Sequence, residues 1–124
     1  MRIETMLRAN AAYSGLAALV LIVGGSNLAH VFAVDARLSI GVGFGLLGWV
    51  VFLLWGAGRP QHLPRVAPMA AAGDVGWIVG AGIILAIPGT MSGSGKVALA
   101  VATVGVAVFA ILQVTELRRI RVRL

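Results

Sequence analysis

The fold is decided by residues 11–34, which read AAYSGLAALVLIVGGSNLAHVFAV. This stretch contains no Asp, Glu, Lys or Arg, so it carries no formal charge unless His30 is protonated. A helix needs about 20 mostly apolar residues to cross the hydrocarbon core, because every backbone N–H and C=O must be hydrogen-bonded within the segment. Residues 11–34 are therefore predicted to form a transmembrane helix.

Three further stretches meet the same requirement, namely residues 38–57, 68–88 and 97–117. Only residues 35–37 separate the first two spans, which predicts a tight hairpin. Residues 58–68 form a polar segment broken by prolines, which is expected not to continue a helix, and residues 89–96 form a short Gly/Ser turn. We therefore predict a single all-α transmembrane domain over residues 1–124, a four-helix bundle with antiparallel neighbours.

The composition excludes a soluble domain. Of 124 residues, 60% are hydrophobic and 11% charged, against about 25% charged in soluble proteins. The absence of cysteine excludes disulfides, thiolate metal sites and thiol redox chemistry. The net charge of +6 comes from basic residues that flank the apolar runs, which favours the bilayer and its anionic headgroups over nucleic acid as partner. No cofactor is expected.

Lys and Arg are distributed unequally between the two ends of the predicted bundle. Eight lie in the N-terminal segment, residues 58–68 and the tail 118–124, whereas the other end has two, Arg37 and Lys96. This imbalance predicts a multi-pass protein of the bacterial inner membrane with both termini cytoplasmic, and it argues against dual topology. The alternative is a cleavable signal peptide ending near residues 31–33, but a signal core spans about 7–15 residues and this run is longer.

The tail after residue 117 alternates basic and apolar residues. Its basic members are Arg118, Arg119, Arg121 and Arg123. Such a pattern is typical of a segment that lies against lipid headgroups. Binding of a partner protein by this tail is the alternative interpretation.

Glycines recur four residues apart in two of the predicted spans, as Gly41 with Gly45 and Gly76 with Gly80. Small residues at this spacing let helices approach closely in lipid, so these four are expected to be packing sites. Residues 43–48 also match the pattern Gly-x-Gly-x-x-Gly, but that motif binds dinucleotides only where a strand enters a helix. Residues 90–96 resemble a phosphate loop but lack its first glycine and its final Ser or Thr.

Asp74 is the most informative polar residue, and it lies about two turns inside the predicted span 68–88. An ionised carboxylate at this depth is costly unless it is paired or hydrated. Asn10, Ser14 and Gln113 fall at a similar depth under the predicted topology. Trp77 shares the helix face of Asp74, one turn further on. These residues are expected to form a polar cluster inside the bundle.

Two interpretations of this cluster stay open. As a site, a carboxylate in a low dielectric can carry a proton or bind a cationic ligand, with Arg8 or Arg118 as a counter-charge. As a structural element, Asp74 can hydrogen-bond neighbouring helices or interact with the N-terminal helix dipole. His30 and His62 are predicted at opposite ends of the bundle, so no metal or haem site is expected from them.

Short motifs relate the chain to a known kind of protein: Arg8-Ala9-Asn10 with Ser14-Gly15, Asp74-Val75-Gly76-Trp77, and Leu112-Gln113. With these motifs the chain resembles, over nearly its whole length, small four-helix bacterial integral membrane proteins. The resemblance implies a membrane location and four helices, and it implies no established reaction. Small multidrug-resistance transporters have a similar length but depend on a glutamate in their first helix, and the span 11–34 has no acidic residue.

The sequence is compatible with two functions from different classes. The favoured one is a non-enzymatic accessory or assembly role, as a subunit of a larger membrane complex or as a self-associating homo-oligomer. It is based on the glycine-rich faces and on the lack of a nucleophile with its base or a metal-ligand set. The alternative is a small transporter or ligand-binding membrane protein that uses Asp74 with Asn10 and Gln113.

Overall fold

The computed structural model describes residues 2–123 of the chain, and side chains as far as residue 119. Within these residues it contains α1 (Ile3–Phe32), α2 (Ala36–Gly58), the short 3-10 helix η1 (Pro60–His62), α3 (Leu63–Ala86) and α4 (Gly93–Arg123), and no strand. All four α-helices are long and apolar enough to cross a membrane. The all-α four-helix membrane bundle predicted from the sequence is confirmed.

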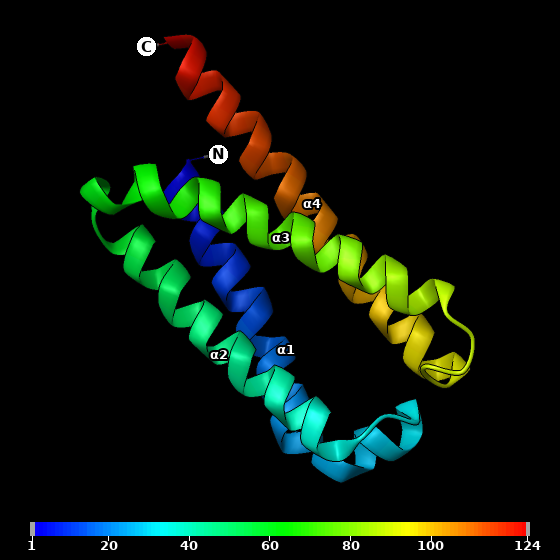
Figure 1. The fold of residues 1–124 in the computed structure, drawn as a ribbon. Coiled ribbons are helices and arrows are strands. Elements are labelled where there is room, and N and C mark those ends of the chain that lie inside the picture. Colours follow the sequence, from blue (N-terminus) through cyan, green and yellow to red (C-terminus); the bar gives the residue numbers. More distant parts are fainter. Residues whose placement is uncertain (1, 124) are drawn as a thin grey trace.

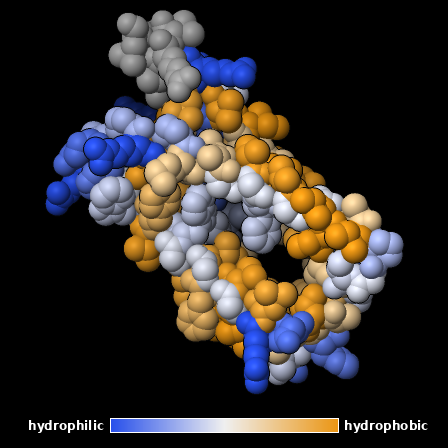
Figure 2. Space-filling view, in the orientation of Figure 1, coloured by the Kyte–Doolittle hydropathy of each residue, from blue (hydrophilic) through white to orange (hydrophobic). Residues whose placement is uncertain are grey.

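The helices form two antiparallel hairpins, α1–α2 and α3–α4 (Figure 1). The start of α1, the α2–α3 connection and the end of α4 lie together at what we call the terminal end. The α1–α2 turn and the α3–α4 loop lie at the opposite end. Hydrophilic side chains gather at both ends, with hydrophobic ones between them (Figure 2). This distribution is expected of a chain whose middle lies in hydrocarbon.

The α1–α2 turn is short because both helices are capped within it. Ala33 adopts a left-handed conformation with φ 54° after the last residue of α1, and Val34 N–H donates to the carbonyl oxygen of Ala29 at 2.9 Å. Asp35 caps α2, since its carboxylate accepts a hydrogen bond from the backbone N–H of Arg37 at 2.7 Å. These two caps account for the tight hairpin expected from the sequence.

Helix α3 begins earlier than the sequence predicts. Pro64 lies in its first turn, where a missing N–H leaves no intrahelical bond unmade, and Pro68 lies inside the helix. The expectation that prolines keep residues 58–68 out of helix is therefore wrong from Leu63 onward. As a result Asp74 is the twelfth of the 24 residues of α3, about three turns from its start instead of two.

Helix α1 bends near the opposite end and is joined there to the α3–α4 loop. Gly25 adopts φ 46° and ψ −127°, a backbone conformation that other residues rarely reach. Ser92 then joins the two hairpins: its N–H donates to Phe32 O at 2.9 Å, and its hydroxyl donates to Val31 O at 2.7 Å. The two hairpins are therefore linked at this end by the hydrogen bonds of Ser92.

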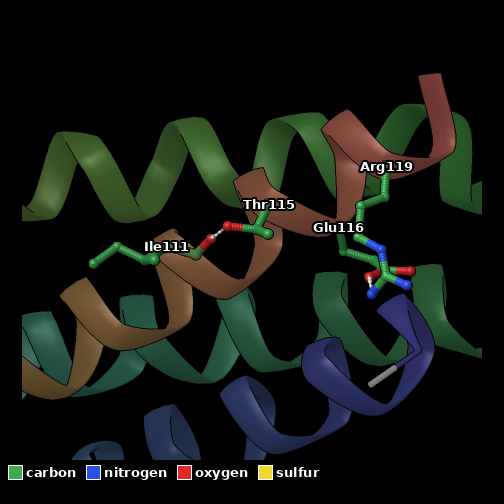
Figure 3. Close-up of polar contacts among 4 residues, drawn as sticks. All are labelled: Ile111, Thr115, Glu116 and Arg119. Atoms are coloured by element: carbon green, nitrogen blue, oxygen red, sulfur yellow. Dashed lines mark hydrogen bonds and ion pairs between the residues drawn. The ribbon is translucent and has the colours of Figure 1, made fainter. Parts of the chain in front are cut away.

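The hairpins also meet at the terminal end, where the largest buried side chains lie. Leu7, Leu53 and Val66 come from α1, α2 and α3, and all three are completely buried. Nearby, the end of α4 passes over the start of α1 (Figure 3). The hairpins are thus joined at both ends of the bundle.

Close packing occurs at glycines other than those predicted. A Cβ built at Gly41, Gly45, Gly76 or Gly80 would meet no atom of another helix within 4 Å, so the packing predicted for them within the chain is wrong. The spacing shows which residues share a face, but it does not show which face meets a neighbour. Close approaches between helices occur instead at Gly43 against Ile22 and Ala18, Gly56 against Val66, Gly73 against Trp49, Gly95 against Phe32 and Gly105 against Tyr13.

Candidate functional site: a cavity beside Asp74

The structure brings Asn10 of α1 and Asp74 of α3 into direct contact inside the bundle. The Asn10 side-chain amide donates to both carboxyl oxygens, at 3.1 Å to Oδ2 and 3.3 Å to Oδ1. Asp74 is 4% exposed and Asn10 is 2% exposed. This pair links the two hairpins through buried side chains 64 residues apart in the sequence.

Ser14 and Gln113 extend this contact into the four-residue cluster that the sequence suggests. The Ser14 hydroxyl donates to the Asn10 side-chain carbonyl at 3.2 Å, which orients the amide nitrogen of Asn10 toward Asp74. Gln113 of α4 is 2% exposed and lies beside the Asp74 carboxyl. Among the described residues, however, neither polar atom of the Gln113 amide has a hydrogen-bond partner of acceptable geometry. The cluster therefore contains a buried polar group with unused hydrogen-bonding capacity.

The expected counter-charge is not found. Arg8 and Arg118 are both exposed, and neither forms an ion pair with Asp74. Within residues 2–119 the salt bridge that forms joins Arg119 Nη1 to Glu116 Oε2 at 3.3 Å, near the end of α4 (Figure 3). The prediction of an arginine beside Asp74 is wrong because both side chains lie on the exposed surface, whereas the Asp74 carboxyl is buried.

Beside the cluster lies a half-open cavity of about 340 Å³ with walls from all four helices. Figure 2 shows the hollow between α3 and the α1–α2 hairpin. Its lining is mainly apolar and includes Ser14, Asp74 and three aromatic side chains, Tyr13, Trp49 and Trp77. The cavity is within the size range of small-molecule sites, about 300–1,000 Å³.

Trp77 is held in the wall by α4. Its indole Nε1–H donates to the Thr103 hydroxyl at 3.3 Å, and that hydroxyl donates in turn to Leu99 O at 2.7 Å. Trp77 is the one aromatic residue of the cavity that the sequence placed with Asp74. Its hydrogen bond to α4 depends on the fold, because Thr103 lies 26 residues away.

Sequence reasoning missed the other two aromatic residues of the cavity. The Tyr13 hydroxyl donates to Ala102 O at 2.7 Å, and Gly105 leaves room for the ring. Trp49 packs against Gly73 of the facing hairpin. Each ring is accommodated by a glycine of a distant segment, so no local pattern in the sequence could have found them.

The remaining candidates lie away from this cavity. Arg118 and Arg119 are exposed, as a headgroup-contacting segment requires, whereas the side chains of Arg121 and Arg123 lie outside the described part. His62 stacks on Trp55 at the terminal end, with ring centroids 3.9 Å apart. Among the described residues, His, Asp and Glu do not gather in groups of three that could hold a metal ion.

The geometry bears on the two interpretations of Asp74. The helix dipole acts mainly within the first turn, and Asp74 lies about three turns into α3, so the dipole does not account for it. The hydrogen bond to Asn10 fits a structural role, and the position in the wall of an open cavity fits a binding role. No protein-family model, curated protein or solved structure matches this chain.

Proposed function

We propose that this protein is a small ligand-binding or transport protein of the membrane, with its site in the cavity beside Asp74. The observation that carries the proposal is that a buried carboxyl, hydrogen-bonded to Asn10, forms part of the wall of an apolar cavity made by all four helices. Intramembrane carboxyls are rare because burial is costly, and they usually mark pathways or binding sites.

Native mass spectrometry of the protein released gently from its own membrane tests this function. The expected result is a stoichiometric small molecule that stays bound to the wild type and is lost on Ala102→Phe, which places a large ring in the cavity wall. Asp35→Asn is a matched control, because it also removes one carboxylate but lies in the α1–α2 turn, where asparagine is an equally good cap. Identical spectra for all three proteins, with ordinary phospholipids alone bound, would contradict the proposal.

A second candidate is the accessory or self-associating role. It is favoured by the glycine pairs Gly41 with Gly45 and Gly76 with Gly80, which meet no side chain of their own chain and so leave helix faces on which another helix can pack. The same spectra report copy number and any bound subunit. For this role a defined oligomer or complex is expected, and Gly41→Leu together with Gly45→Leu should dissociate it. A monomer before and after the substitutions would exclude it.

The proposed location is the bacterial inner membrane, with the terminal end in the cytoplasm and in contact with anionic headgroups. Its support is the concentration of Lys and Arg at the terminal end, against Arg37 and Lys96 at the opposite end.

A further inference from the structure

The Asp74 carboxyl is contacted by neutral groups alone among the described residues. Asn10 supplies its hydrogen bonds, at 3.1 and 3.3 Å, and Gln113 lies beside it. Within residues 2–119 no basic side chain forms an ion pair with Asp74. An ionised carboxyl without a cation is strongly unfavourable in the membrane, so a positive group that enters the cavity stabilises the ionised form of Asp74.

The polar donors of the cavity wall are already engaged. The Tyr13 hydroxyl donates to a backbone carbonyl of α4, the Trp77 indole donates to Thr103, and the Ser14 hydroxyl donates to Asn10. The groups left to face a ligand include the carboxyl oxygens and the aromatic rings. Both attract positive charge, because the face of an aromatic ring is its negative pole. An anion would meet repulsion here.

The cavity opens sideways, between α3 and the α1–α2 hairpin (Figure 2). The surface around this depth is apolar, and Val75 and Val79 of α3 are among its exposed side chains. In a bilayer this surface lies in hydrocarbon, so a molecule that enters through the side must first dissolve in the lipid. The ligand must therefore combine a positive charge with a largely apolar body.

We propose, on the basis of the function proposed above, that the ligand is a lipophilic organic cation, with an ammonium group beside Asp74 and its apolar substituents against Trp49 and Trp77. Such a ligand gains from the attraction between its ammonium group and Asp74 and also from its contacts with the two aromatic rings. An uncharged molecule of equal shape keeps only the contacts with the apolar walls.

Two probes of nearly equal shape separate charge from shape: phenyltrimethylammonium and its uncharged isostere, tert-butylbenzene. Saturable binding of each is measured by equilibrium dialysis against the full-length protein in phosphatidylcholine nanodiscs, with empty nanodiscs as background. Zwitterionic lipid is used so that anionic headgroups do not recruit the cation. The variants are Asp74→Asn, Asp74→Glu, which retains the charge, and Asp35→Asn as the matched control.

The expected result is that wild type and Asp35→Asn bind the cation at least about tenfold more tightly than the isostere, a difference of about 1.4 kcal/mol. Asp74→Asn should lose this preference while binding the isostere as before, and Asp74→Glu should restore most of it. An unchanged preference in Asp74→Asn, or wild-type preference for the isostere, would overturn the cation assignment and leave the cavity as a site for neutral molecules. Failure of both probes to bind saturably would overturn the proposed function as well.

Two of these measurements need no substitution of Asp74. The wild-type preference for the cation over the isostere needs no substitution at all. Ala102→Phe keeps the carboxyl and occupies the cavity, so it should abolish binding of both probes, and retained binding there would place the site elsewhere. Far-ultraviolet circular dichroism of each variant in the same nanodiscs checks that the helices are intact.

Discussion

Replacing Gly56 by alanine tests how the two hairpins are joined at the terminal end. A Cβ built at Gly56 would lie 2.5 Å from Val66 Cβ and 2.8 Å from Val66 Cγ2, and closest of all to Cγ1. Val66 is completely buried, and because its Cβ is fixed to the backbone, rotation of the side chain cannot remove the clash. The added methyl group must therefore push α2 and α3 apart.

The expected change in the free energy of unfolding on Gly56→Ala is the sum of two opposing contributions. Overpacking of a tightly filled contact costs about 1–3 kcal/mol, whereas alanine is favoured over glycine inside a helix by about 1 kcal/mol. Gly48→Ala on the same helix isolates the second contribution, because its added Cβ would meet nothing within 4 Å. We expect Gly56→Ala to be less stable than Gly48→Ala by about 1–3 kcal/mol, measured by reversible SDS unfolding in mixed micelles.

The clash itself can be checked with a double-mutant cycle. Val66→Gly removes all three atoms that the new methyl group would strike, Cβ included, so Gly56→Ala should cost much less in that background. If Gly56→Ala is as stable as Gly48→Ala, or if its cost is the same with and without Val66, the described contact between α2 and α3 does not exist in the folded protein.

Three further predictions concern the Asn10 hydrogen bonds, the bend of α1 and the orientation of the chain in the membrane. Asn10→Ala should lower the free energy of unfolding by about 1–3 kcal/mol because it removes the hydrogen bonds to the Asp74 carboxyl. Reversible unfolding in mixed micelles measures this change. An unchanged stability would contradict the hydrogen bonds between Asn10 and Asp74. Gly25→Ala should cost about 1–3 kcal/mol in the same assay because φ is 46°, and an unchanged stability would show that α1 is not bent there. Because the chain has no cysteine, Gln61→Cys at the terminal end and Ser94→Cys at the opposite end each introduce a single thiol. A membrane-impermeant maleimide added to intact cells should label Ser94→Cys and leave Gln61→Cys unlabelled. The reverse labelling would mean that the terminal end faces away from the cytoplasm.

In the Asp74 cluster, the sequence predicted which polar residues lie together but not which charged groups lie beside them. Asn10, Ser14, Asp74 and Gln113 were expected at one depth because antiparallel spans of known length fix the depth of each residue. The structure brings them together for that reason. The arginine counter-charge was predicted wrongly, since a residue's depth along its helix does not say whether its side chain faces the interior of the bundle or the exposed surface.

The sequence by itself determined that the chain crosses a membrane as four helices, because apolar segments of that length must satisfy their backbone hydrogen bonds internally. Only the tertiary structure decided which face of each helix meets another. In lipid all faces of these helices are apolar, so hydrophobicity does not separate the packed face from the exposed one, and close fit between particular side chains does. For this reason Gly73 and Gly105 take the contacts expected at Gly41 and Gly76, and the aromatic cavity beside Asp74 appears only in the folded chain.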